Sequence, residues 1–209
     1  MVERVPLSET HSGVPLNVNI QQDIAACLSG EKAMQAIVPS DDEFGEWEAI
    51  KLTPSGYPYE VREVLYVLLH EGDHLADMPH LVQLAVTSDI TPPAVPDVLA
   101  EFSVELEAVD QGPNVISLSL DTPLNLTDGE TLWVFVEMNG IVGQFVGFSK
   151  MALAHCPDTD WDPGAFWSQS TTTPYDWTPM STFGLYEDPM VWARGTLYAE
   201  FGDVNYITK

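Results

Sequence analysis

The stretch that decides the fold is Thr131-Leu132-Trp133-Val134-Phe135-Val136, which is apolar at every position after the threonine. Successive side chains of a β-strand point to opposite faces of its sheet. A stretch that is apolar on both faces therefore predicts a central strand, covered on both sides. The turn signal Thr127-Asp128-Gly129 lies directly before it, so we expect the strand to begin near residue 131.

Short segments of the same kind, separated by turn residues, run outward from this strand in both directions. Residues 101–108 alternate between polar and apolar side chains, as in a strand with one face in water. Residues 114–120 place Ile116, Leu118 and Leu120 on one face. Further candidate strands are residues 33–38, 46–52, 81–87, 144–149, 151–155 and 191–201. Roughly ten short strands at this spacing predict an all-β, antiparallel, jelly-roll-like β-sandwich.

The chain length of 209 residues suits one domain. We assign residues 31–209 to a single β-sandwich domain, which follows an irregular N-terminal arm formed by residues 1–30. The arm is polar and weakly patterned, and we expect a short helix in it at residues 21–28.

The segment 58–76 fits two kinds of element. A helix would place five apolar residues on one face, namely Val61, Val64, Leu65, Leu68 and Leu69. Enrichment in Val and Tyr favours a strand instead, and the pair Gly72-Asp73 favours a turn directly after it. We therefore expect a strand that ends near His70.

The composition is strongly acidic, with 32 Asp and Glu against 7 Lys and Arg and a formal net charge of −25. Nucleic-acid binding needs clustered Lys and Arg, so this composition argues against it, and it argues equally against adsorption to anionic lipid. No apolar run approaches the ~18 residues of a membrane-spanning segment. The acidity fits a solvated surface that keeps the protein soluble, which we favour, or a surface that divalent cations neutralise.

The two cysteines, Cys27 and Cys156, are far apart in the sequence. They are either two buried thiols or one disulfide. The acidic, lysine-poor composition favours an oxidising compartment and therefore the disulfide. An oxidising compartment implies a secreted, extracellular protein. The first residues lack the apolar segment of a signal peptide, so we expect the sequence to be the mature form of that protein.

Three segments resemble a loose group of secreted bacterial β-sandwich proteins, many of them from myxobacteria. Residues 57–68, beginning Tyr-Pro-Tyr-Glu-Val, resemble a strand entry of that group, and residues 124–134 resemble its strand in which a glycine precedes Trp-Val. Residues 166–193 are similar to its closing pattern of Ser, Trp and Ala. The resemblance implies a jelly-roll-like fold and an extracellular location, but no agreed activity. This chain departs from the group in its His- and Asp-rich loop at residues 70–80.

That loop contains the spacing of an HExxH zinc motif in His70, Glu71 and His74, and His80 falls at the position of a third zinc ligand. On a helix, His70 and His74 would share one face and bind Zn²⁺. Glu71 would then activate the metal-bound water. This pattern resembles the metzincin proteases, so a zinc metallohydrolase or protease is the alternative function.

Two residues of the loop argue against that alternative. Gly72 weakens the helix that the motif requires, and Asp77 replaces the glycine at which the metzincin chain turns. On a strand, the same histidines fit a metal site without protease chemistry, or a plain exposed hairpin.

A second acidic turn contains Asp158, Asp160 and Asp162 at alternate positions, a spacing that calcium loops use. The EF-hand pattern fails, because Pro163 lies where its glycine belongs and Gln169 replaces its bidentate glutamate. We favour an acidic turn over a Ca²⁺ site. Ca²⁺ and Zn²⁺ are thus the two candidate ions, and neither is required.

Aromatic residues are dense in the same region and beyond it: Trp161, Phe166, Trp167, Tyr175, Trp177, Phe183, Tyr186 and Trp192. Aromatic faces beside carboxylates suit stacking on sugar rings, although such rings also cover the ends of cores. The predicted ligand-binding residues are Trp161, Trp167, Tyr175 and Trp177.

The sequence has no nucleophile elbow, phosphate-binding loop or Cys-His pair, and its carboxylates are too many to single out an acid/base pair. We therefore expect a non-catalytic secreted domain that binds a glycan or another cell-surface ligand through its aromatic, acidic loop region. A purely structural or assembly role is the third alternative.

Overall fold

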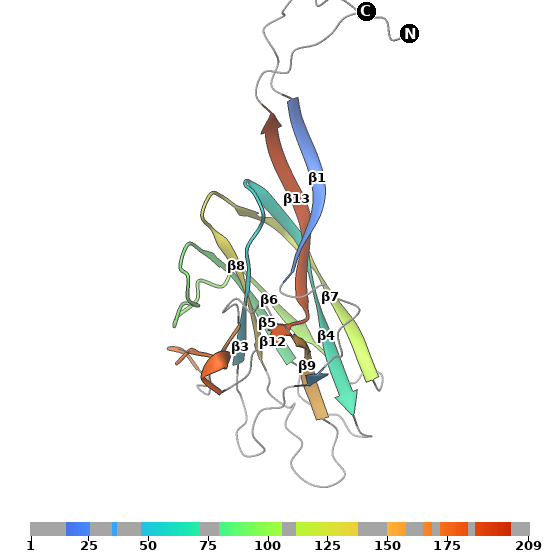
Figure 1. The fold of residues 1–209 in the computed structure, drawn as a ribbon, viewed down its shortest axis with the longest axis vertical. Coiled ribbons are helices and arrows are strands. Elements are labelled where there is room, and N and C mark those ends of the chain that lie inside the picture. The colour runs from blue at the N-terminus through green and yellow to red at the C-terminus, as the bar shows by residue number, and fades with distance from the viewer. Residues whose placement is uncertain are drawn as a thin grey trace, which may run out of the picture.

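The computed structural model describes residues 16–25, 35–36, 47–71, 80–105, 112–137, 150–157, 165–168, 172–183 and 187–201. These residues form two sheets in which all strand pairs are antiparallel, with one short 3₁₀ helix, Met180–Phe183. Figure 1 shows β3, β8, β5 and β6 on one side of the molecule and β13, β4 and β7 on the other. The predicted all-β, antiparallel β-sandwich is confirmed.

The six-stranded sheet contains the apolar stretch at residues 131–136. Its order is β11 (Thr178–Pro179), β10 (Ala165–Ser168), β3 (Trp47–Leu52), β8 (Thr131–Glu137), β5 (His80–Thr87) and β6 (Ala100–Val104). β8 pairs with β3 along Trp47–Leu52 and with β5 along Val82–Thr87. The prediction of a central strand at residues 131–136 is confirmed.

The seven-stranded sheet is built around β4. Its path is β1 (Leu16–Ala25), β13 (Val191–Phe201), β4 (Tyr59–Glu71), β9 (Lys150–Pro157) and β12 (Glu187–Pro189), with β2 (Gln35–Ala36) on β9 and β7 (Gly112–Leu126) on β4. The last residues of β13, 198–201, pair with β1 and not with β4, and this two-stranded ribbon extends beyond the sandwich in Figure 1.

The main core lies between the sheets, because one face of each sheet supplies its side chains. Strand β8 contributes Leu132, Val134 and Val136, and β4 contributes residues such as Tyr59 and Tyr66. Members of both sheets are fully buried there. Burial of this many large apolar side chains is the main force that holds the sheets together.

The expected helix at residues 21–28 is wrong over its described part. Residues 21–25 belong to β1, which pairs with β13 along its whole length. The backbone hydrogen bonds that a helix would make locally are made across strands instead. Residues 26–28 lie outside the described residues, and the division of the chain at residue 30 stays a prediction.

The other segment predictions fall into three groups. The strand predicted to end near His70 is confirmed as β4, and seven further candidate segments each overlap a strand: 33–38, 46–52, 81–87, 101–108, 114–120, 151–155 and 191–201. The candidate 144–149 lies outside the described residues. Strands β1, β10, β11 and β12 were not predicted. Within the described part of the chain, no helix is long and apolar enough to cross a membrane.

Stability at high pH is expected to depend on Tyr66, which is fully buried in the main core. Burial raises the pKa of its hydroxyl far above the ordinary value of 10.0. The unfolded chain ionises this tyrosine near pH 10 while the folded protein keeps it protonated, so the free energy of unfolding falls as the pH rises above about 10. Urea unfolding at pH about 9 and about 11 measures the decline, which Tyr66→Phe should make shallower. An equal decline in both proteins would contradict this assignment.

Candidate functional site

A second cluster of buried side chains lies on the outer face of the six-stranded sheet. In β8, Trp133 and Phe135 alternate with the residues that face the main core, so they point away from it. In β3, Trp47 and Ala49 do the same. The whole cluster consists of Trp47, Ala49, Ala85, Trp133, Phe135, Phe166 and Tyr175. We call it the outer aromatic cluster.

The segment 172–179 covers this cluster with two aromatic rings. The ring centroid of Tyr175 lies 5.6 Å from that of Trp47 and 5.0 Å from that of Trp177. The Trp177 centroid in turn lies 5.5 Å from that of Phe135. Centroid separations of 4.5–7 Å with tilted planes are the favourable arrangement for aromatic pairs.

The loop between β5 and β6 is tied to the same segment. The indole Nε1 of Trp177 donates a hydrogen bond to the Pro93 carbonyl oxygen at 2.9 Å. The backbone N–H of Tyr175 donates to the Ala94 carbonyl oxygen at 2.7 Å. The first bond fixes the orientation of the Trp177 ring, and the second fixes the backbone of Tyr175 against the loop.

A depression of about 560 Å³ lies between the loop and the segment. Its lining residues are Thr91, Pro92, Ala94, Phe166, Tyr175, Asp176, Trp177 and Pro179. Tyr175 is 7% exposed and Trp177 is half-buried, so their rings form the wall and base and do not project into solvent. Ala94 and Asp176 are exposed at the rim. The depression thus combines aromatic and proline surface with one carboxylate.

The Asp176 carboxylate is held in a defined orientation. The hydroxyl of Ser168 donates to its Oδ1 at 2.6 Å, and the backbone N–H of Asp176 donates back to that hydroxyl oxygen at 3.2 Å. Ser168 is buried in β10, so the carboxylate is anchored to the sheet. Burial, with smaller contributions from Glu137 and Glu101, raises the pKa of Tyr175, so its hydroxyl stays protonated.

Two of the four predicted ligand-binding residues, Tyr175 and Trp177, line the depression together. Trp167 lies in β10, with its backbone paired to Glu48 and Thr178. Trp161 lies outside the described residues. The role of each of the four in binding stays a prediction.

The sequence reasoning missed Asp176 and the loop 91–94 as parts of the site. The Thr91-Pro92-Pro93 stretch carried only a turn signal, and nothing in a sequence indicates which distant segment a turn contacts.

The predicted zinc residues are placed by their backbone. His70 and Glu71 end strand β4 and His80 begins β5, while His74 lies outside the described residues. Because residues 70 and 71 are extended, the helical geometry in which the two motif histidines share a face does not begin there. Among the described residues, no group of three or more His, Cys, Asp or Glu side chains could hold a metal ion. The zinc site stays a prediction.

Two other predictions depend on residues outside the described ranges. The calcium candidates Asp158, Asp160 and Asp162 all lie there, so that site stays a prediction. Cys156 lies in β9, opposite Asp188 of β12. Its predicted disulfide partner Cys27 is outside the described residues, and the bridge stays a prediction as well.

The chain was compared with known proteins at three levels. No family model matches it, and no curated protein matches it. The resemblance to secreted bacterial β-sandwich proteins therefore stays a prediction.

Solved structures do match. A variant of the clostridial cysteine protease Cwp84 after propeptide cleavage is 11% identical, with a TM-score of 0.50, and the match covers 85% of this chain and 40% of that one. The cysteine protease and lectin-like domains of Cwp84, a surface layer associated protein of Clostridium difficile, are 12% identical with a TM-score of 0.44. That second match covers 73% of this chain and 32% of the other. The chain thus spans less than half of these neighbours, and at such identities the first likeness is one of fold alone.

Proposed function

We propose that this chain is a non-catalytic, extracellular β-sandwich domain that binds a glycan of a cell surface in the depression formed around Tyr175, Asp176 and Trp177. The observation that carries the proposal is the combination of an aromatic wall with one oriented carboxylate. The apolar faces of sugar rings pack against aromatic side chains, and their hydroxyls donate to carboxylates.

The same lining favours binding over hydrolysis. Glycosidases generally use two carboxyl groups that flank the scissile bond at a fixed separation. Asp176 is the one carboxylate among the described residues that line the depression. A single carboxylate is suited to holding a hydroxyl.

The site is also organised before any ligand arrives. Trp177 is held by its hydrogen bond to Pro93, and Asp176 is held by Ser168. Side chains that are already ordered lose little conformational entropy on binding, so more of the contact energy appears as affinity. A volume of about 560 Å³ is within the range of small-ligand sites.

Filling the depression is expected to abolish glycan binding without disturbing the fold. Ala94 lines it but is exposed, so Ala94→Trp adds a ring in the binding space and removes no core contact. We expect wild-type protein to retain oligosaccharides on a glycan array, and Ala94→Trp to weaken the best of them about ten-fold or more by calorimetry.

Val95→Trp is the matched control, because Val95 is 65% exposed in the same loop and does not line the depression. It should bind as wild type does. The proposal fails if wild-type protein retains no glycan, or if Ala94→Trp and Val95→Trp bind equally well.

A further inference from the structure

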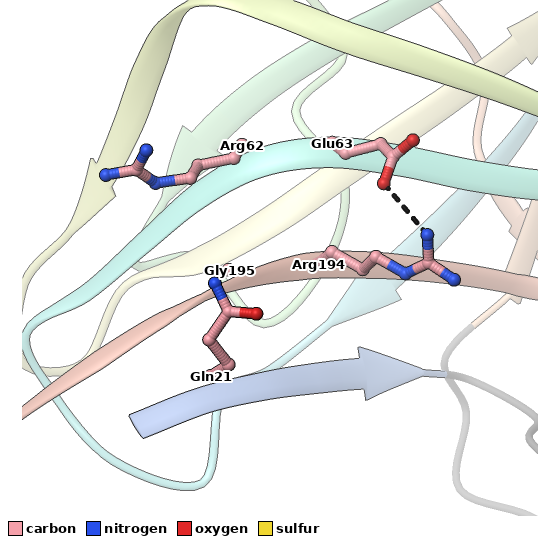
Figure 2. A pocket seen from close by; sticks show the side chains of 5 residues that line it. All are labelled: Gln21, Arg62, Glu63, Arg194 and Gly195. Carbon is pink, nitrogen blue, oxygen red and sulfur yellow. Dashed lines mark hydrogen bonds and ion pairs between the residues drawn. The ribbon is translucent and has the colours of Figure 1, made fainter. Parts of the chain in front are cut away.

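A second hollow lies on the outer face of the seven-stranded sheet, away from the aromatic depression. Its volume is about 450 Å³. It is lined by Gln21 from β1, Arg62 and Glu63 from β4, and Arg194 and Gly195 from β13. Figure 2 shows the Gln21 amide over Gly195, between the Arg62 side chain on one side and the Arg194–Glu63 pair on the other.

A bulge in β4 creates this arrangement. Val61 pairs with Gly195 and Glu63 with Arg194, so Arg62 is skipped in the register with β13. It is skipped in the register with β7 as well, where Val61 pairs with Leu124 and Glu63 with Ser119. An extra residue in a strand redirects the side chains around it.

The redirection places two neighbouring polar side chains on the same face. Val61 and Val64 both belong to the main core. Between them the strand has two residues where strict alternation allows one, so Arg62 and Glu63 both lie on the outer face. Arg194, next to the core residue Ala193, is on that face too.

Ion pairs hold the two guanidinium groups in place. Arg194 Nη1 lies 3.2 Å from Glu63 Oε2, and Arg62 forms an ion pair with Glu60. The hydroxyl of Ser117 donates a further hydrogen bond to Glu63. The arginine side chains are 57% and 53% exposed, so a ligand in solution reaches both.

Two of the chain's few cationic side chains meet in this hollow. The lining has two arginines and one glutamate, although the chain has only 7 Lys and Arg and a net charge of −25. Each arginine pairs with a glutamate, so these four side chains together carry no net charge. The partner of Arg194, Glu63, lies inside the hollow, whereas the partner of Arg62, Glu60, is not among the lining residues. A guanidinium has five N–H donors, so Arg62 keeps donors for a ligand beside its hydrogen bonds to Glu60 and Tyr198. Gln21 and Glu63 add amide and carboxylate groups that pair with hydroxyls.

We propose that this hollow binds an acidic sugar unit, a pyranose that carries one carboxylate, with the carboxylate on Arg62 and ring hydroxyls on Gln21 and Glu63. A planar guanidinium forms two parallel hydrogen bonds to a carboxylate, which gives both affinity and orientation. The volume suits one or two sugar rings. The proposal does not rest on the aromatic depression, because the two sites are on the outer faces of different sheets.

Calorimetric and NMR titrations with sodium D-glucuronate, D-glucose and sodium acetate test it on the whole chain. Glucuronate should bind saturably and shift the backbone amide signals of Gln21 and Gly195, and glucose and acetate should each bind about ten-fold more weakly. Arg62→Gln should weaken glucuronate binding about ten-fold. Arg62→Lys keeps the positive charge but loses the planar guanidinium, so its affinity for glucuronate should lie between those of wild type and Arg62→Gln.

Lys51→Gln is the matched control, since it removes one positive charge from the other sheet, and it should bind glucuronate as wild type does. Ala94→Trp should also leave glucuronate binding unchanged, which separates this site from the aromatic depression. The proposal is overturned if glucuronate does not bind, if Arg62→Gln with a wild-type melting temperature binds it equally well, or if Ala94→Trp removes the binding.

Discussion

Replacing Trp133 with alanine is expected to lower the free energy of unfolding by about 4 kcal/mol. Trp133 is fully buried in β8, the central strand of its sheet. It meets Phe166 of β10 at a centroid distance of 5.8 Å, with the rings edge to face. Truncation would leave a cavity in the outer aromatic cluster. The loss of stability would combine the lost burial of the indole with the lost contacts around the cavity.

Urea unfolding followed by far-UV circular dichroism measures the effect without relying on tryptophan emission. Trp133→Phe is the variant to compare with Trp133→Ala, because the indole N–H that it removes has no hydrogen-bond partner among the described residues. Phenylalanine removes that N–H and leaves a smaller cavity, so we expect less than half of the alanine effect.

Ile90→Ala supplies the baseline for these variants. Ile90 is 79% exposed, so its truncation should change the free energy of unfolding by less than about 0.5 kcal/mol. A loss below about 1 kcal/mol in Trp133→Ala would show that the outer aromatic cluster is not packed as described.

Much of the fold could be predicted from the periodicity of apolar residues in the sequence, and β8 shows why. Its residues 132–136 are apolar on both faces because two separate cores meet there, the main core under Leu132 and Val134 and the outer aromatic cluster under Trp133 and Phe135. Burial on each face selects for apolar side chains whatever the neighbouring strands are, so the pattern is readable without knowing them.

Strand β1 has the alternating pattern of a strand, although a helix was predicted for part of it. Leu16, Val18 and Ile20 alternate with polar residues, the same period of two that identified other strands. The polar run Gln21-Gln22-Asp23 after them obscured it. Its partner β13 lies at the far end of the sequence, so the alternation indicates a strand but not the strand with which it pairs.

The candidate sites were less accessible to prediction, because each depends on chain segments meeting in space. The aromatic residues of the segment 172–177 indicated the region of the depression, but not that Thr91, Pro92 and Ala94 line its other side. The hollow depends on a register shift at Arg62, and a bulge has no reliable sequence signature. A local sequence pattern indicates which side chains are buried. Contacts between segments that are distant in sequence follow only from the packing of the whole chain.

Replacing Gly195 with alanine is expected to lower the free energy of unfolding by about 3 kcal/mol. A Cβ at this position would lie 2.2 Å from the Glu60 carbonyl oxygen and 2.6 Å from Cζ of the Tyr59 ring. The oxygen belongs to the backbone of β4, and Tyr59 is fully buried with its hydroxyl donating to the Ala193 carbonyl oxygen at 3.4 Å. Neither neighbour is able to move aside cheaply, so the two strands must separate at the bulge.

Gly56→Ala is the matched control for this variant. The Cβ it adds would approach only the flexible end of Leu197, at 3.3 Å, so the change should cost less than about 1 kcal/mol. Both substitutions restrict the unfolded chain equally, so the difference between them isolates the native clash. Urea unfolding of the two variants and wild type gives that difference. If Gly195→Ala is as stable as Gly56→Ala, then β13 does not approach β4 closely at the bulge, and the floor of the hollow beside Arg62 is not the surface described.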